Sequence, residues 1–123
     1  MRFKFVATVV AGAAILCGGV AATAQAVTTY PTTINYRAAD GAPGDEVFSG
    51  DLDSPKHACE RLRLVGGFAD FGSGFELFDL DYSSFHGAWA VRGNVAAASE
   101  FKFKVARQVY RHFACAADHV AIP

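Results

Sequence analysis

The sequence lacks an excess of positive charge, since 11 Lys and Arg residues stand against 12 Asp and Glu residues, for a net charge of −1. A chain of this kind has no basic stripe to neutralise phosphates, so we expect no nucleic-acid partner. The Gly-x-Ser-x-Gly motif of serine hydrolases is also missing, and no long segment has the periodicity of an amphipathic helix. These absences predict a protein that is neither helical nor an enzyme and that needs no cofactor.

The first 26 residues have the pattern of a secretory signal peptide. Arg2 and Lys4 give a positive start, residues 6–16 are apolar, and residues 24–26 form an Ala-Gln-Ala triplet. Small residues in this arrangement predict cleavage after Ala26 and a secreted protein. An uncleaved membrane anchor is the alternative, because residues 6–24 carry no charge and are nearly long enough to span a bilayer.

Residues 27–123 are then the mature protein, which we expect to form a single domain. Removal of the signal takes away two cations and no acids, which leaves nine Lys and Arg against twelve Asp and Glu. We expect no membrane association once the signal is cleaved. A core of this size is modest, and small secreted domains often add a disulfide.

Two cysteines remain after residue 26, Cys59 and Cys115, and they are 56 positions apart. An oxidising compartment and an even cysteine count predict that they form a disulfide. In the chain-entropy model, a loop of that size restricts the unfolded state by about 4 kcal/mol. The alternative is a metal site, in which His57 and His112 join the two cysteines as ligands of Zn²⁺.

Short segments with a period of two, separated by turn residues, predict β-strands in most of the mature chain. These strands are expected at residues 32–36, 47–52, 61–65, 75–82, in the run after Gly87, at 100–109 and at 118–122. About seven short strands and no long helix predict an all-β fold, a two-sheet antiparallel β-sandwich.

The alternation also predicts which side chains are buried. In residues 61–65 we expect Leu62 and Leu64 to face the core, and Arg61 and Arg63 to face water. Trp89 is expected in the core.

In residues 75–82 the alternation places Phe78, Leu80 and Tyr82 on one face of the strand and Asp79 and Asp81 on the other. We interpret the two aspartates as the solvent face of a strand. A weak Ca²⁺ site is the alternative.

The order of several short motifs resembles that of a known family. The motifs are the Thr-rich run 31–36, Phe48-Ser-Gly50 with Ser54, Cys59 with Arg61-Leu-Arg-Leu-Val65, Gly87-Ala-Trp89-Ala-Val91, the Phe-Lys-Phe-Lys-Val run and Cys115. Together they resemble the secreted bacterial β-sandwich proteins grouped as carboxypeptidase-regulatory-like or transthyretin-like domains. The resemblance implies an Ig-like or transthyretin-like sandwich, linked cysteines, a core strand at Gly-x-Trp-x-Val and no catalytic residues. The chain departs from the family at Ser84, where an Asp is common.

Four phenylalanines in or beside glycine-rich loops, Phe68, Phe71, Phe75 and Phe85, form a candidate binding patch. The alternative, which we favour from the sequence, is that these rings fold back over one end of a small core.

The sequence therefore predicts a secreted, disulfide-linked, non-catalytic module that binds an unknown protein or surface ligand, or has a structural role, at the cell envelope or outside the cell. The second hypothesis is a metal-binding protein that uses His57, Cys59, His112 and Cys115. A small hydrolase with Ser83 or Ser84 beside His86 is the third.

Overall fold

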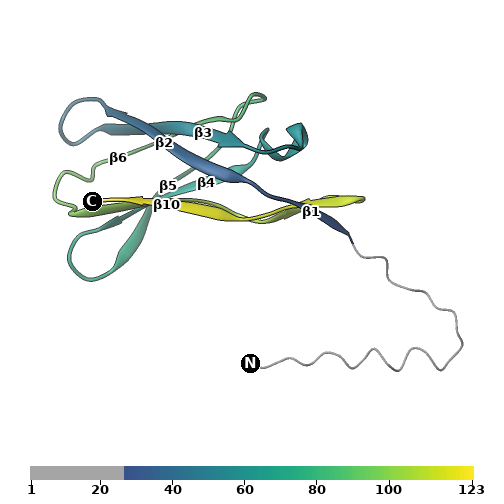
Figure 1. Cartoon of the computed structure of the whole chain (residues 1–123). Coiled ribbons are helices and arrows are strands. Elements are labelled where there is room, and N and C mark those ends of the chain that lie inside the picture. Colours follow the sequence, from purple (N-terminus) through teal and green to yellow (C-terminus); the bar gives the residue numbers. More distant parts are fainter. Residues whose placement is uncertain (1–26) are drawn as a thin grey trace, which may run out of the picture.

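The computed structural model describes residues 27–123, and the predicted signal peptide lies outside these residues. Within this range the chain forms ten β-strands and one short 3-10 turn. Two antiparallel sheets pack face to face, which confirms the predicted all-β sandwich (Figure 1). The prediction of about seven strands was too low, because a small third sheet was not expected. No helix in the described part of the chain has the length and hydropathy needed to cross a bilayer.

The larger sheet has four strands in the order β10-β7-β4-β5. Its members are β4 (Leu64–Asp70), β5 (Phe75–Tyr82), β7 (Glu100–Val105) and β10 (Asp118–Ile122). All neighbours in this sheet are antiparallel. The β4–β5 hairpin bends away from the sandwich at its tip, which is the teal loop at the lower left of Figure 1.

The opposing sheet has three strands in the order β2-β3-β6. Its members are β2 (Thr33–Asp40), β3 (Glu46–Asp53) and β6 (Ala88–Gly93). Alternate residues of these strands point into the space between the two sheets, as expected for a half-buried strand.

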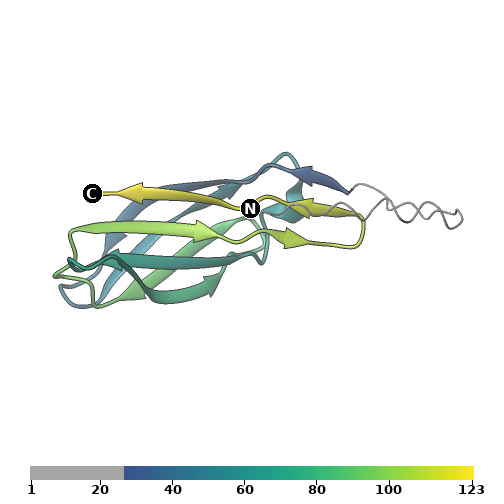
Figure 2. The same ribbon diagram turned by 90° about the horizontal axis from the view of Figure 1, so that it is seen from below.

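The third sheet has three short strands in the order β1-β9-β8 and lies at one end of the sandwich. It contains β1 (Thr28–Tyr30), β8 (Gln108–Val109) and β9 (Phe113–Cys115). Strand β1 pairs with β9 in parallel, and β8 pairs with β9 in an antiparallel hairpin. Figure 2 shows this sheet at the right, where dark blue β1 lies beside the yellow hairpin.

Aromatic rings fill the centre of the core. Phe103 is fully buried, and its ring centroid lies 5.1 Å from that of Trp89 and 5.3 Å from that of Phe48. The Trp89 indole N–H donates to the Asp51 carbonyl at 3.2 Å, so the ring is buried without an unpaired donor. The core position predicted for Trp89 is confirmed.

An aspartate bridges the two sheets along each open side of the sandwich. On one side Asp79 of β5 accepts from the Arg92 backbone N–H of β6 at 2.8 Å. On the other side Asp118 of β10 accepts from the Ile34 backbone N–H of β2 at 3.0 Å. A carboxylate that accepts a backbone N–H makes a strong, charge-assisted hydrogen bond, so these two bonds link the sheets.

The predicted strand at residues 61–65 is wrong in its start and in its faces. The 3-10 turn η2 (His57–Cys59) precedes a bend, and β4 begins only at Leu64. Leu62 has a φ of +51° and is exposed, whereas Arg63 is fully buried. The left-handed residue breaks the alternation, because it turns the chain between the two arginines.

The predicted strand at residues 100–109 is two strands. Strand β7 ends at Val105 and β8 begins at Gln108, where the chain leaves the large sheet for the small one. The break coincides with the Ala106 carbonyl, which accepts from the Arg63 side chain and is not available to a sheet partner.

Candidate binding surface

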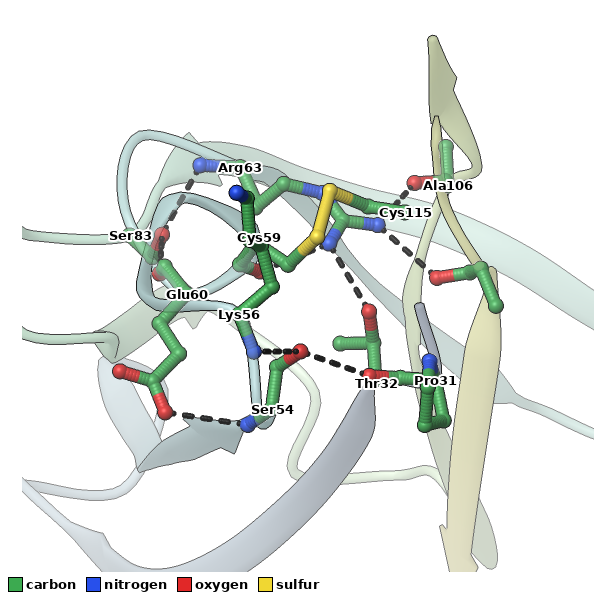
Figure 3. The surroundings of a disulfide bond; sticks show 11 residues. Pro31, Thr32, Ser54, Lys56, Cys59, Glu60, Arg63, Ser83, Ala106 and Cys115 are labelled. Atoms are coloured by element: carbon green, nitrogen blue, oxygen red, sulfur yellow. Dashed lines mark hydrogen bonds between the residues drawn. A yellow bond between two sulfur atoms is a disulfide. The ribbon is translucent and has the colours of Figure 1, made fainter. Parts of the chain in front are cut away.

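The predicted disulfide is confirmed. Cys59 at the end of η2 and Cys115 at the end of β9 are bonded, and their Cα atoms are 5.4 Å apart, an ordinary spacing for a disulfide. Both residues are fully buried (Figure 3). The bond therefore joins the middle of the chain to the small terminal sheet.

The metal alternative is not formed in residues 27–123. The two sulfur atoms that it needs as thiolates are bonded to each other. No group of three or more His, Cys, Asp and Glu side chains converges in this part of the chain. His57 instead places its Nδ1 3.2 Å from a Glu60 carboxylate oxygen, and His112 lies exposed in the β8–β9 turn.

Beside the disulfide lies a buried arginine that the sequence pattern assigned to the surface. The Arg63 side chain donates to four acceptors, shown as dashed lines in Figure 3. These are Thr32 Oγ1 at 3.1 Å and the carbonyls of Cys59 at 2.8 Å, Ala106 at 2.6 Å and Ala116 at 3.0 Å. Arg63 therefore joins four separate segments through one planar group, a role for which guanidinium geometry is well suited.

Within the described residues, Arg63 forms no ion pair with a carboxylate. Burial lowers the pKa of its guanidinium, while the nearby Tyr110 raises it in part. Its Nε is buried without a hydrogen-bond partner. A buried cation held only by dipoles is costly unless those acceptors are well placed, so the four bonds explain how this burial is tolerated.

Serine side chains complete this end of the fold. Ser83 Oγ accepts from the Arg63 backbone N–H at 2.9 Å and donates to the Glu60 carbonyl at 2.8 Å. Ser84 Oγ accepts from the backbone N–H groups of His86 and Ala88. These bonds hold the two serines of the hydrolase hypothesis against the backbone.

Four of the exposed large apolar side chains in residues 27–123 lie together on a different surface, the outer face of the four-stranded sheet. Leu77 and Leu80 are each 50% exposed, and Tyr82 is 63% exposed. Phe75 is also exposed, and Phe68 of the neighbouring strand is half-buried. We call these five residues, Phe68, Phe75, Leu77, Leu80 and Tyr82, the apolar column.

A register shift explains why the apolar column points outward. Gly67 pairs with Asp79, but the next residue, Phe68, pairs with Leu77, so Phe78 has no direct partner. Phe78 turns inward against the core, with its ring centroid 5.9 Å from that of Phe48. The prediction that Phe78, Leu80 and Tyr82 share a face is therefore wrong, because an extra residue in one strand reverses the alternation.

Two lysines of β7 flank the apolar column. Lys102 Nζ lies 4.4 Å from the Phe75 ring centroid, and Lys104 Nζ lies 5.0 Å from that of Phe68. Both ammonium groups lie within the range of cation–π attraction. Neither forms an ion pair with a carboxylate of the described residues. The outer face thus carries an apolar strip beside a cationic strip.

An open groove of about 600 Å³ runs along this face. Its lining includes Leu64, Phe68 and Leu80 from the β4–β5 hairpin, with Lys104 and His119 across from them. Gly66 leaves room for the neighbouring side chains, since a Cβ there would lie 3.2 Å from both Leu80 Cδ2 and Phe68 Cε1. The floor of the groove is therefore backbone, and its walls combine apolar side chains with the polar residues Lys104, Asp118 and His119.

Strand β5 is an edge strand of the large sheet, but its edge is partly covered. The backbone N–H of Leu80 donates to Asp79 at 2.9 Å, and that of Tyr82 donates to Asp81 at 2.8 Å. These donors are not available to a further strand, which blunts the edge against pairing. Asp79 is not on a solvent face as predicted, because its carboxylate also bridges to β6.

The structure separates the four phenylalanines of the predicted patch. Phe68 and Phe75 belong to the apolar column, Phe71 is exposed at the hairpin tip, and Phe85 is 59% exposed in the loop after β5. The favoured alternative, in which the rings fold back over the core, is wrong for Phe71, Phe75 and Phe85.

Sequence reasoning missed Leu77, Leu80 and Tyr82 as surface residues. The only signal in the sequence was the pair Gly66-Gly67 opposite them, which marks a strand that can shift its register.

Comparison of the chain with protein-family models, with curated proteins and with solved structures gives no match. The resemblance to carboxypeptidase-regulatory-like and transthyretin-like domains therefore stays a prediction.

Proposed function

We propose that this chain is a secreted, non-catalytic binding module, and that the outer face of its four-stranded sheet is the binding surface. The observation that carries the proposal is the apolar column, which lies on β4 and β5 and is exposed beside Lys102 and Lys104, two lysines without an ion pair in residues 27–123. Large apolar side chains that gather on one face of a small domain mark an interaction site more often than scattered ones do.

The chemistry of the face indicates the partner. Leu77 and Leu80 offer an apolar contact, and Lys102 and Lys104 offer positive charge along one side of it. A protein surface that is apolar and bordered by carboxylates is complementary to this arrangement. We therefore commit to a protein partner of that kind.

The mode of contact follows from the edge of β5. Because Asp79 and Asp81 occupy two outward backbone donors, addition of a partner strand is disfavoured. The partner is expected to pack on the face of the sheet, over the groove.

Secretion supports the same function. The expected signal peptide and the buried disulfide both fit a protein that works in an oxidising compartment.

The test is site-specific photo-cross-linking in the cells that produce the protein. A photoreactive amino acid replaces Leu80 on the proposed surface or Ala90, an exposed residue of β6 on the other sheet. We expect one discrete adduct from position 80 and none from position 90. Introducing Lys102→Glu and Lys104→Glu should abolish the adduct, because both changes repel a carboxylate-bordered partner.

Absence of an adduct at position 80, equal adducts at both positions, or an adduct that survives the two charge reversals would each refute the proposal.

A further inference from the structure

The small sheet at the end of the molecule carries a second surface, which the proposed function does not use. Tyr110 stacks on Phe113 with ring centroids 4.8 Å apart, and Tyr30 meets Phe113 edge-on at 6.0 Å. Lys56 places its ammonium 4.7 Å from the Phe113 ring centroid. Val109 beside them is 63% exposed. The end of the molecule is therefore a small, partly exposed cluster of apolar and aromatic groups.

Positive charge surrounds this cluster. Arg107 precedes β8 and Arg111 lies in the β8–β9 turn, and both are exposed. Residues 27–32 and 106–117, which contain the small sheet and its connections, include no Asp or Glu. None of the ion pairs found in residues 27–123 involves Lys56, Arg107 or Arg111. We call these three cations, together with Tyr30, Tyr110 and Phe113, the basic tip.

The charge of the basic tip is opposite to that of the rest of the domain. Residues 27–123 contain nine Lys and Arg against twelve Asp and Glu, whereas the segments 27–32 and 106–117 hold Arg107 and Arg111 and no acid, and Glu60 is the acid nearest to Lys56 in the 54–60 turn. The remaining surface is therefore strongly acidic overall. Such a charge dipole orients the molecule in a field, with the basic tip toward a negative surface.

The chain enters the fold at this tip. Val27 is exposed directly before β1 (Thr28–Tyr30), the first strand of the small sheet, so the described part of the chain begins at this end (Figure 2). If the expected signal is cleaved, the new α-amino group at Val27 adds another cation to the tip. If it is kept as an anchor, the same end lies next to the bilayer.

We propose that the basic tip binds the headgroup region of an anionic phospholipid bilayer. Lys and Arg near a negative membrane surface each contribute about 1 kcal/mol of attraction. Tyrosines suit the interface, because the ring is apolar and the hydroxyl stays hydrated. This proposal departs from the expectation of no membrane association after cleavage, because the fold places the exposed Arg107 and Arg111 together at one end of the domain. It describes peripheral binding, with the face of the large sheet left accessible.

The experiment is vesicle flotation with the purified protein. One set of vesicles is pure phosphatidylcholine, and the other contains about 30% phosphatidylglycerol in phosphatidylcholine, a fraction chosen to give the negative surface potential of an anionic leaflet. We expect binding only to the anionic vesicles, and weaker binding as salt is raised, because salt screens the attraction. The protein used is the form that begins at Val27, so that residues 1–26 do not contribute to the binding.

The charge variant is Arg107→Gln with Arg111→Gln, and the control is Arg37→Gln with Arg92→Gln. The control removes the same net charge from exposed positions of β2 and β6. We expect the tip variant to bind anionic vesicles about thirtyfold less tightly, the factor that about 1 kcal/mol for each of two basic residues gives. The control should change binding less than about twofold, since its charges belong to the opposing sheet, are ion-paired with Asp51 and Asp45, and are screened by salt.

A third variant, Tyr110→Ser, keeps the charge and removes the ring that stacks on Phe113. It should weaken vesicle binding several-fold and leave binding to a short DNA duplex unchanged. Equal binding to both kinds of vesicle, or equal loss in the tip variant and the control, would overturn the proposal. The proposal would also fail if the protein bound the DNA duplex as tightly as it binds the anionic vesicles, and if Tyr110→Ser changed neither of these two affinities.

Discussion

The disulfide end and the outer face of the large sheet break the usual rule of burial in opposite ways. At the disulfide end a fully buried arginine donates to four acceptors, beside a buried pair of cysteines. On the outer face, leucines that could have filled a core are half exposed. The first departure is compensated by hydrogen bonds and so belongs to stability. The second has no such compensation within residues 27–123, and it is the basis of the proposed binding surface.

The largest effect on stability should come from Arg63→Met. This change leaves Thr32 Oγ1 and three carbonyls without their donor, and each buried unsatisfied group costs about 1–3 kcal/mol. Because some of these groups can regain water, we expect a loss of about 3–5 kcal/mol in the free energy of unfolding, measured with urea. Arg61→Met is the matched control, since Arg61 is exposed, and it should change stability by less than about 0.5 kcal/mol. If Arg63→Met lowered the free energy of unfolding by as little as Arg61→Met, the hydrogen bonds of Arg63 would not stabilise the fold as we infer.

The next largest effect should come from the disulfide. Replacing Cys59 and Cys115 together with serine should lower the free energy of unfolding by about 2–4 kcal/mol, because the unfolded chain loses its cross-link. The stability of the reduced wild-type protein is the comparison for this variant. In denaturant without reductant, neither cysteine of the wild-type protein should react with an alkylating reagent. If both cysteines of the wild-type protein react with the alkylating reagent without reductant, and that protein still unfolds cooperatively, the disulfide is contradicted.

Substitutions at two adjacent glycines of β4, Gly66 and Gly67, allow the packing on the two faces of this strand to be compared. A Cβ at Gly67 would lie 2.7 Å from Phe78 Cζ and 2.9 Å from Val91 Cγ2, both in the packed interior. A Cβ at Gly66 would meet only the ends of side chains on the outer face, at 3.2 Å or more. We expect Gly67→Ala to cost about 1–3 kcal/mol by overpacking, and Gly66→Ala to cost clearly less. Thermal unfolding of both variants side by side measures the difference, and the reverse order would mean that the outer face is packed like a core.

The strand pattern and the disulfide could be predicted from the sequence because both depend on local signals. The alternation in a period-two run such as Phe101-Lys-Phe-Lys-Val105 favours a strand, and the two cysteines after residue 26 allow only one intramolecular pairing. The burial of Arg63 could not be predicted in this way. It depends on the left-handed turn at Leu62 and on acceptors that come from distant segments, including Thr32 and Ala116.

The apolar column was predicted only in part, for a related reason. The phenylalanines near the glycine-rich loops were recognisable as exposed candidates, and Phe75 is a member of the apolar column. Leu77 and Leu80 were not recognised, because a single extra residue opposite Gly67 and Phe68 decides which face they occupy. Register is a property of the paired strands, and one strand read alone does not contain it.

The measurement that tests the comparison most directly is the urea unfolding of Leu77→Ser with Leu80→Ser. If these side chains serve binding, their loss removes few buried contacts, and the free energy of unfolding should change by no more than about 1 kcal/mol. A loss of about 3–5 kcal/mol, the size expected for deletion of core side chains, would show that the apolar column holds the fold together and would contradict its assignment to a partner.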